Sequence, residues 1–143
     1  MRTTVAHILS HKGREVWSVD SATSVFDALE LMADKNIGAL VVIDAGVLVG
    51  IISERDYARK VILRGRESRH TPVADIMTQH PVTVTPVKTV RECMALMTAN
   101  RFRHLPVVDG GTLYGVVSIG DVVRAVIDEQ EFVIDQLEGY ITG

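Results

Sequence analysis

The chain has 143 residues, 47% of them hydrophobic, and a formal net charge of −3 at pH 7. This length predicts one domain or two very small ones with a sizeable core, and the slightly acidic balance argues against a nucleic-acid partner. The longest apolar run, residues 37–43, covers seven residues, whereas a membrane-spanning helix needs about 20. The first residues lack the apolar region of a secretory signal, and the single cysteine, Cys93, cannot form an internal disulfide. We therefore expect a soluble, cytoplasmic protein with no membrane partner.

Two copies of one sequence unit fill most of the chain. Residues 19–62 align without a gap with residues 84–127, and 15 of the 46 aligned pairs that begin at Trp17 and Val82 are identical. Several mismatched pairs keep their apolar character, such as Ile51 with Val116 and Ile52 with Val117. Such internal similarity predicts two copies of one structural unit.

The first copy predicts a β-α-β-β-α unit. A strand is expected over residues 16–19, and strands over 39–43 and 47–52 form a hairpin whose turn ends in Gly46. Between them lies a helix with one buried face, marked by i, i+3, i+4 and i+7 spacing at Val25, Ala28, Leu29 and Met32. A second helix is expected to begin at Ser53.

The second copy repeats this order. Strands are expected over residues 82–84, 105–108 and 113–117, with a helix after the first strand whose buried face includes Cys93. The final helix begins at Ser118 and is expected to stop near Gly139. Capping boxes are expected where the first helix of each copy begins, at Ser24 with Asp27 and at Thr89 with Glu92.

The predicted fold class is α/β, of the α+β kind, with two tandem units that pack by pseudo-twofold symmetry. We place the first unit at residues 1–68 and the second at 69–143, joined by the polar, basic linker 64–71. Each unit of about 55–60 residues is too small for a generous core by itself, so the two are expected to fold together.

The two hairpins end in similar text, Gly50–Asp56 and Gly115–Asp121, and Arg103–Asp109 leads into the second hairpin. With these motifs at the same offset, the chain resembles a pair of CBS domains, the arrangement called a Bateman module. The resemblance implies a non-catalytic sensor or regulator that binds AMP, ADP, ATP, NAD or another adenosine-containing ligand. It also implies a homodimer of modules and an unidentified protein target that receives a conformational signal.

The residue types of the Ser-x-x-Asp motifs suit a nucleotide. The free N–H groups at a helix start favour an anionic phosphate, and a carboxylate one turn later can accept hydrogen bonds from a ribose diol. The same motif is also a capping box, which stabilises a helix without any ligand. The two roles can coexist.

The resemblance implies two nucleotide sites, each with its Ser and Asp from one unit and its other walls from the second unit. One site would comprise Ser53, Asp56, Val82, Thr83, Val84, Arg103 and His104. The other would comprise Ser118, Asp121, Trp17, Ser18, Val19, Ile37, Gly38 and Ala39, with Arg55 near the phosphates. No metal site and no catalytic cofactor are expected.

Some of these residues have a second reading. Arg55 and Arg59 share a helix face in a basic run and favour phosphate contact, but such a run can also be a solvated face. His104 can line the site or be a hydrogen-bonded core histidine, and Trp17 can stack on a base or pack on a strand. The other histidines are expected on the surface.

Two other functions compete with nucleotide sensing. An enzyme is disfavoured because nucleophile, phosphate-loop, zinc-protease and dinucleotide motifs are absent and Cys93 lies on a buried helix face. An interaction module with a vestigial ligand site is the main alternative. Its partner surface would be the acidic C-terminal segment: Asp128, Glu129, Glu131, Asp135 and Glu138. The apolar face of the last helix is a separate candidate surface for a homodimer, and it can equally pack back on the core: Val126, Val133, Ile134, Leu137 and Ile141.

Overall fold

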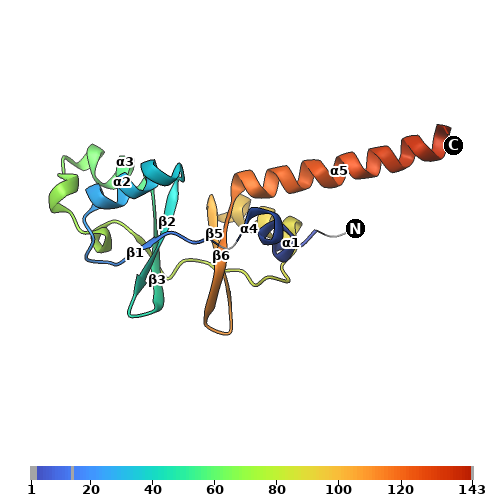
Figure 1. Ribbon diagram of the computed structural model, residues 1–143. Coiled ribbons are helices and arrows are strands. Elements are labelled where there is room, and N and C mark those ends of the chain that lie inside the picture. Colours follow the sequence, from blue (N-terminus) through green and yellow to red (C-terminus); the bar gives the residue numbers. More distant parts are fainter. Residues whose placement is uncertain (1–2, 14, 143) are drawn as a thin grey trace. The chain divides into compact units, whose positions relative to one another are not determined.

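The structure is a computed structural model that describes residues 3–13 and 15–142 (Figure 1). The chain divides into two compact units. Residues 15–82 form one, here called the first-repeat unit, and residues 3–13 with 83–142 form the other, the second-repeat unit.

This division differs from a cut of the sequence at residue 68, because the segment before each repeat packs on the other repeat. The Val5 N–H donates to the Lys88 carbonyl at 2.9 Å, and the Val90 N–H donates to the Thr3 carbonyl at 2.8 Å. In the same way, residues 71–73 exchange backbone hydrogen bonds with residues 23–25 in the first-repeat unit. Backbone pairing over a long sequence separation thus decides which unit each segment joins.

The first-repeat unit is built on a four-stranded sheet in the order β1-β2-β3-β4. β1 pairs parallel with β2, and the other neighbours pair antiparallel. Its elements are β1 (Ser18–Val19), α2 (Val25–Lys35), β2 (Ala39–Asp44), β3 (Val47–Ser53), α3 (Glu54–Lys60), η1 (Ile62–Arg64), η2 (Ser68–His70), η3 (Val73–Asp75) and β4 (Thr78–Gln79).

Among the described residues, the second-repeat unit has the same hairpin, which forms a two-stranded sheet. Its elements are α1 (Val5–Lys12), α4 (Val90–Asn100), β5 (His104–Asp109), β6 (Thr112–Ser118) and α5 (Ile119–Thr142). Figure 1 shows α5 as a long helix whose C-terminal half extends past α1 and α4 of its own unit.

The strand predicted over residues 82–84 is reduced to a single parallel bridge between Val84 and Val107. Val84 donates to the Pro106 carbonyl and accepts from the Val108 N–H. The next bond of a parallel ladder would need an N–H from Pro106, which proline lacks. The equivalent position in the first copy is Val41, and there β1 forms.

Each unit has its own core of apolar residues. In the first-repeat unit it includes Val25, Met32 and Ile52 of α2 and β3, and in the second-repeat unit Val90, Met97 and Val117 of α4 and β6, all at most 3% exposed. The burial expected for Cys93 is confirmed, since its side chain is 0% exposed, and burial raises the pKa of its thiol. The helix faces read from the apolar spacing are therefore the buried faces.

The helix ends match the predicted caps with two differences. Thr89 and Glu92 form the complete reciprocal box, whereas at the start of α2 the structure shows the half in which Ser24 accepts the Asp27 N–H. The last helix does not stop near Gly139 but continues to Thr142. A glycine inside a helix costs only about 1 kcal/mol, which does not end a helix by itself.

Candidate functional site

The first Ser-x-x-Asp motif forms the start of α3. Ser53 is the N-cap: its N–H donates to Asp56 Oδ2 at 2.9 Å, and its Oγ accepts the Asp56 N–H at 3.2 Å. Lys60 lies one turn later, with Nζ 3.3 Å from Asp56 Oδ1 and 2.9 Å from the Ile76 carbonyl that it also binds. α3 has only seven residues, so the helix itself adds little field for an anion.

The second motif forms the start of α5 with the same reciprocal bonds. The Ser118 N–H donates to Asp121 Oδ2 at 2.8 Å, and the Asp121 N–H donates to Ser118 Oγ at 3.1 Å. Lys12, from the last turn of α1, donates to the same Oδ2 at 2.7 Å and to the Val116 carbonyl at 2.9 Å. Arg124 lies further off, 4.0 Å from Asp121 Oδ1.

Asp121 is an ionised, mostly buried carboxylate. Its side chain is 12% exposed, and this burial alone raises its pKa. The hydrogen bonds from Lys12 and Ser118, together with the charge of Lys12, outweigh burial and hold the pKa below its usual value. A charged acceptor is therefore fixed at the start of α5.

His104 lies beside this carboxylate. It faces Ser118 in the β5–β6 register, and its half-buried imidazole has a lowered pKa. Burial is the main cause, and the charges of Lys12 and Arg103 add to it, while Asp121 opposes them. His104 is thus a neutral ring at neutral pH that can donate or accept a hydrogen bond.

The corresponding backbone in the first-repeat unit lies beside Ser53. The Gly38 carbonyl accepts the Glu54 N–H at 3.1 Å, and Ala39 faces Ser53 in the β2–β3 register. In the second-repeat unit, the Arg103 carbonyl does the same for the Ile119 N–H. The start of each helix is thus hydrogen-bonded to the residue just before the first strand of its hairpin, β2 or β5.

The other predicted site residues have varied surroundings. Trp17 is half-buried against the core, with Lys35 Nζ 4.1 Å from its ring centroid, and Ile37 also packs on that core. Ser18 and Val19 make up β1. Val82 is 38% exposed and Thr83 is exposed, whereas Val84 is a core residue at 3% exposure.

The basic run splits into two kinds of residue. Arg66 pairs with Asp75 at 2.6 Å, and Arg69 stacks on Phe26 with 3.8 Å to the ring centroid. Arg59 is exposed at the last turn of α3, and Arg55 is half-buried near its start. Arg66 and Arg69 are thus held by contacts within their own unit, whereas phosphate contact by Arg55 and Arg59 remains a prediction.

Sequence reasoning missed the two lysines that face the motif aspartates. Lys60 lies four residues after Asp56, and that helical spacing was a readable signal. Lys12 lies 109 residues from Asp121 in the sequence, and no spacing pattern links residues that far apart. Only the packing of α1 on its unit brings it there.

The second-repeat unit also holds a pocket of about 460 Å³ between α1 and α5. Its lining is mixed, with apolar, cationic and acidic side chains: Thr3, His7, Ile8, His11, Lys12, Asp121, Arg124, Ala125, Asp128, Glu129 and Phe132.

Over residues 3–13 and 15–142, no group of three or more potential ligands could hold a metal ion. In the same ranges, no helix has the length and hydropathy needed to cross a membrane.

Comparison with known proteins gives a consistent result. The family model described as "CBS domain" matches residues 5–63 and 73–128. The mitochondrial CBS domain-containing protein CBSX3 of Arabidopsis thaliana is 45% identical over 99% of this chain and 73% of its own. A putative signal-transduction protein with CBS domains from Burkholderia ambifaria is 52% identical, with a TM-score of 0.86, over 90% of this chain and 96% of its own. CBSX2, solved in complex with AMP, is 32% identical with a TM-score of 0.70, over 90% of this chain and 98% of its own.

Proposed function

Because the chain belongs to the CBS-domain family, we propose that it is a non-catalytic regulatory protein that binds an adenosine nucleotide at its two Ser-x-x-Asp helix starts. The observation that carries the proposal is that Asp56 and Asp121 occupy the same position in two repeats, each fixed by its N-cap serine. The AMP complex of the relative CBSX2 supports an adenine nucleotide as the ligand.

The bonding of Asp121 leaves room for a ribose. A carboxylate offers about four acceptor positions, and Oδ2 uses two of them for Ser118 and Lys12. Within residues 3–13 and 15–142, the partner that the structure gives Oδ1 is Arg124 at 4.0 Å, beyond hydrogen-bond distance. Oδ1 can therefore accept the 2′- and 3′-hydroxyls of a nucleoside as charge-assisted hydrogen bonds.

Asp56 is bonded in a similar way, but a cation lies closer to its Oδ1 than to the Oδ1 of Asp121. Oδ2 accepts from Ser53, and Oδ1 lies 3.3 Å from Lys60 Nζ. Since Lys60 is 42% exposed, it can turn to solvent at little cost when a ligand arrives. We therefore propose two sites of unequal strength rather than two identical ones.

The remaining predicted site residues belong to the same proposal. Arg55, Arg59, Arg103 and His104 would contact phosphate or sugar. The walls would come from the residues at the first and second strands of each repeat: Trp17, Ser18, Val19, Ile37, Gly38, Ala39, Val82, Thr83 and Val84. Binding would bias the protein toward one conformation by its differential affinity, and a protein target would read that bias. A cytoplasmic location and NAD or ATP as ligand remain predictions.

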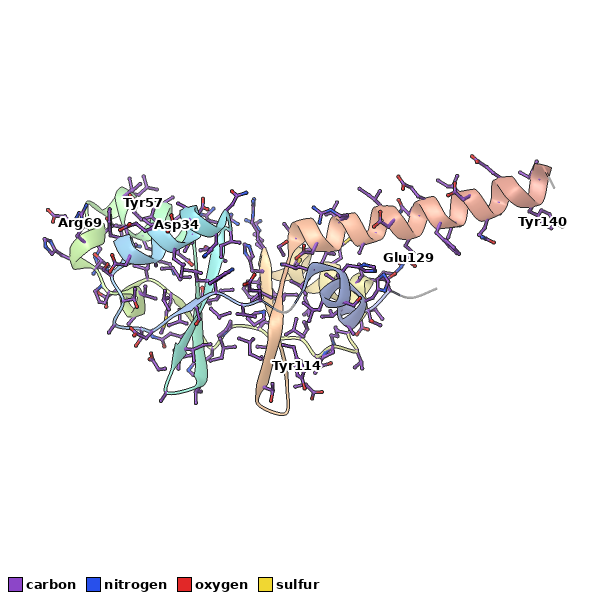
Figure 2. The ribbon with its side chains drawn as sticks, in the orientation of Figure 1. Asp34, Tyr57, Arg69, Tyr114, Glu129 and Tyr140 are labelled. Carbon is purple, nitrogen blue, oxygen red and sulfur yellow. The ribbon has the colours of Figure 1, made fainter. Side chains whose placement is uncertain are left out.

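The test is calorimetric titration of the full chain with AMP, ADP, ATP and NAD, alongside thermal unfolding. At 100 times its dissociation constant, a ligand stabilises the fold by about 2.7 kcal/mol. Asp56→Asn and Asp121→Asn each remove one charged acceptor, so each is expected to weaken binding at its own site by roughly 10–100-fold. Asp34→Asn, which changes an exposed carboxylate on α2 (Figure 2), is the matched control and should leave binding unchanged.

The control separates a local effect from a loss of net charge. If neither motif variant changes nucleotide binding, the ribose assignment is wrong. If the wild-type chain binds none of the four nucleotides, the proposed function fails as a whole.

A further inference from the structure

The C-terminal half of α5 carries large apolar side chains with no cover from the chain's own core. Every side chain from residue 131 to 141 is exposed. The apolar ones are 49–88% exposed: Phe132, Val133, Ile134, Leu137, Tyr140 and Ile141. Figure 2 shows Tyr140 near the end of the helix, beyond the rest of its unit.

These side chains are not scattered but follow a heptad. Ile127, Ile134 and Ile141 recur every seven residues, and Val123, Gln130 and Leu137 recur every seven at the intervening positions. In heptad terms they are a and d positions, with isoleucine at each a. We call these six residues the heptad seam. Its five apolar members are 47–80% exposed.

The other faces of α5 are already used within the second-repeat unit. Val122 is 0% exposed in the core, and Val126 packs partly against it. Asp121, Ala125, Asp128 and Phe132 line the pocket toward α1. At 100° per residue, the seam lies nearly opposite the pocket side, so docking of α1 leaves it open.

We propose that the heptad seam binds the same seam of a second copy of this chain, as an antiparallel two-helix coiled coil. Isolated exposed leucines are ordinary, but a continuous apolar stripe of this length marks an interaction site. A period of 3.5 residues specifies another helix as the occupant. This inference stands apart from the proposed nucleotide sites, because no seam residue belongs to them.

The antiparallel register follows from the spacing of the seam. Ile127 meets the partner's Leu137, Val123 meets the partner's Ile141, and Gln130 meets the partner's Ile134. The six seam residues thereby all find a partner. Beside the seam, Val133 meets the partner's Val133 across the twofold axis, which makes the contact self-complementary.

Charge favours this direction over a parallel one. α5 carries one cation after its start, Arg124, whereas Asp128, Glu129, Glu131, Asp135 and Glu138 make its second half acidic. In the antiparallel register, Arg124 lies beside the partner's Glu138, twice by symmetry, which outnumbers the single contact between Glu131 and the partner's Glu131 at the axis. The acidic half also faces the positive end of the partner's helix. A parallel pair would lay the two acidic halves side by side and give Arg124 no carboxylate besides that of Asp121 in its own chain.

The first experiment measures the oligomeric state of the full chain by sedimentation over a range of concentrations. The wild type is expected to dimerise reversibly, and Leu137→Asp to raise the dimer dissociation constant at least about tenfold. Gln130→Leu, which replaces the polar seam member, should tighten the dimer. Val87→Asp is the matched control, since Val87 is also 80% exposed but lies outside α5.

The second experiment tests direction by cross-linking with a short bismaleimide. Val133→Cys is expected to cross-link to itself, because Val133 faces its own copy only in the antiparallel pair, and Ile127→Cys is expected not to. Cys93 is buried and serves as the unreactive background. The charge exchange Arg124→Glu with Glu138→Arg should restore a dimer that either change alone weakens.

Three results would overturn the proposal. They are a monomer at all concentrations, a dimer that Leu137→Asp and Val87→Asp affect equally, and cross-linking through Ile127→Cys instead of Val133→Cys. Nucleotide titration of the Leu137→Asp variant keeps the two proposals apart, because failure of one leaves the other measurable.

Discussion

Lys12 Nζ lies 2.7 Å from Asp121 Oδ2, although 109 residues separate the two in the sequence. Lys12 is 41% exposed and Asp121 12%, so this is a half-shielded ion pair rather than a solvated one. It joins the last turn of α1 to the start of α5. The N-terminal helix therefore sets the electrostatics of one predicted nucleotide site.

Removal of this lysine is expected to change the titration of Asp121. In Lys12→Met, the pKa of Asp121 should rise, because burial then acts with less opposition from hydrogen bonds and charge. The measurement is an NMR titration of the aspartate side-chain carboxyl carbons. Lys88→Met is the control: it removes a lysine of similar exposure that pairs with Glu92, and it should leave the pKa of Asp121 unchanged. An equal shift in both variants would contradict the pairing.

The same lowered pKa predicts how stability depends on acid. A carboxylate whose folded pKa lies below its unfolded value binds fewer protons in the folded state, so its stabilisation is present above the unfolded pKa near 3.8. It is lost as the pH falls through the folded pKa. Asp121→Asn should therefore flatten the acid limb of the unfolding free energy below about pH 4, relative to Asp34→Asn.

The burial of His104 predicts a second loss of stability on acidification, in a pH range above that of Asp121. Its folded pKa is lowered from 6.5, so between these two values the unfolded chain binds the proton more readily than the folded one. The free energy of unfolding should thus fall as the pH drops below about 6.5. Chemical denaturation of the wild type and of His104→Gln at pH 7.5, 6.5 and 5.5 tests this.

The control for this prediction is another histidine. His80 is exposed with φ 49°, a conformation that asparagine tolerates, so His80→Asn keeps the backbone and removes one exposed imidazole. His104→Gln should show a shallower pH dependence than His80→Asn. The same slope in both variants would show that burial of His104 has no effect on the pH dependence of stability.

Local sequence patterns predicted the fold well. The helix faces at Val25 and Val90, and the hairpins that end at Ser53 and Ser118, follow from apolar spacing and turn residues, which act within one element. The two N-caps were also readable, because the Ser-x-x-Asp box closes within one helical turn. These features depend on neighbours in sequence, so sequence alone specifies them.

Features that depend on distant pairing could not be read in this way. Backbone hydrogen bonds such as the one from Val5 to Lys88 place the N-terminal helix on the second repeat, and no local pattern encodes that choice. The strand at Val84 is reduced because Pro106, which lies on a different strand, has no N–H to donate. The sequence left open whether the apolar face of α5 packs on the core or stays exposed, because exposure depends on which other elements pack nearby.

Two glycines provide a last prediction, because each lies under a side chain from the segment that precedes the other repeat. A Cβ at Gly50 would lie 2.7 Å from Met77 Sδ and 2.9 Å from the Thr78 carbonyl oxygen. A Cβ at Gly115 would lie 2.8 Å from Leu9 Cδ2, and its other close contacts are also with the Leu9 side chain. A side-chain end can move, whereas the carbonyl is held in the β3–β4 pairing.

Alanine at Gly50 is therefore expected to destabilise the protein more than alanine at Gly115. Overpacking of this kind costs about 1–3 kcal/mol, and we expect Gly50→Ala near the top of that range and Gly115→Ala near the bottom. Urea unfolding measures both. Adding Leu9→Ala to Gly115→Ala should cost less than the sum of the two single changes, because the smaller side chain removes the clash. Strict additivity at Gly115, or a smaller loss at Gly50 than at Gly115, would show that these glycines are not required by the approach of the segment before the other repeat.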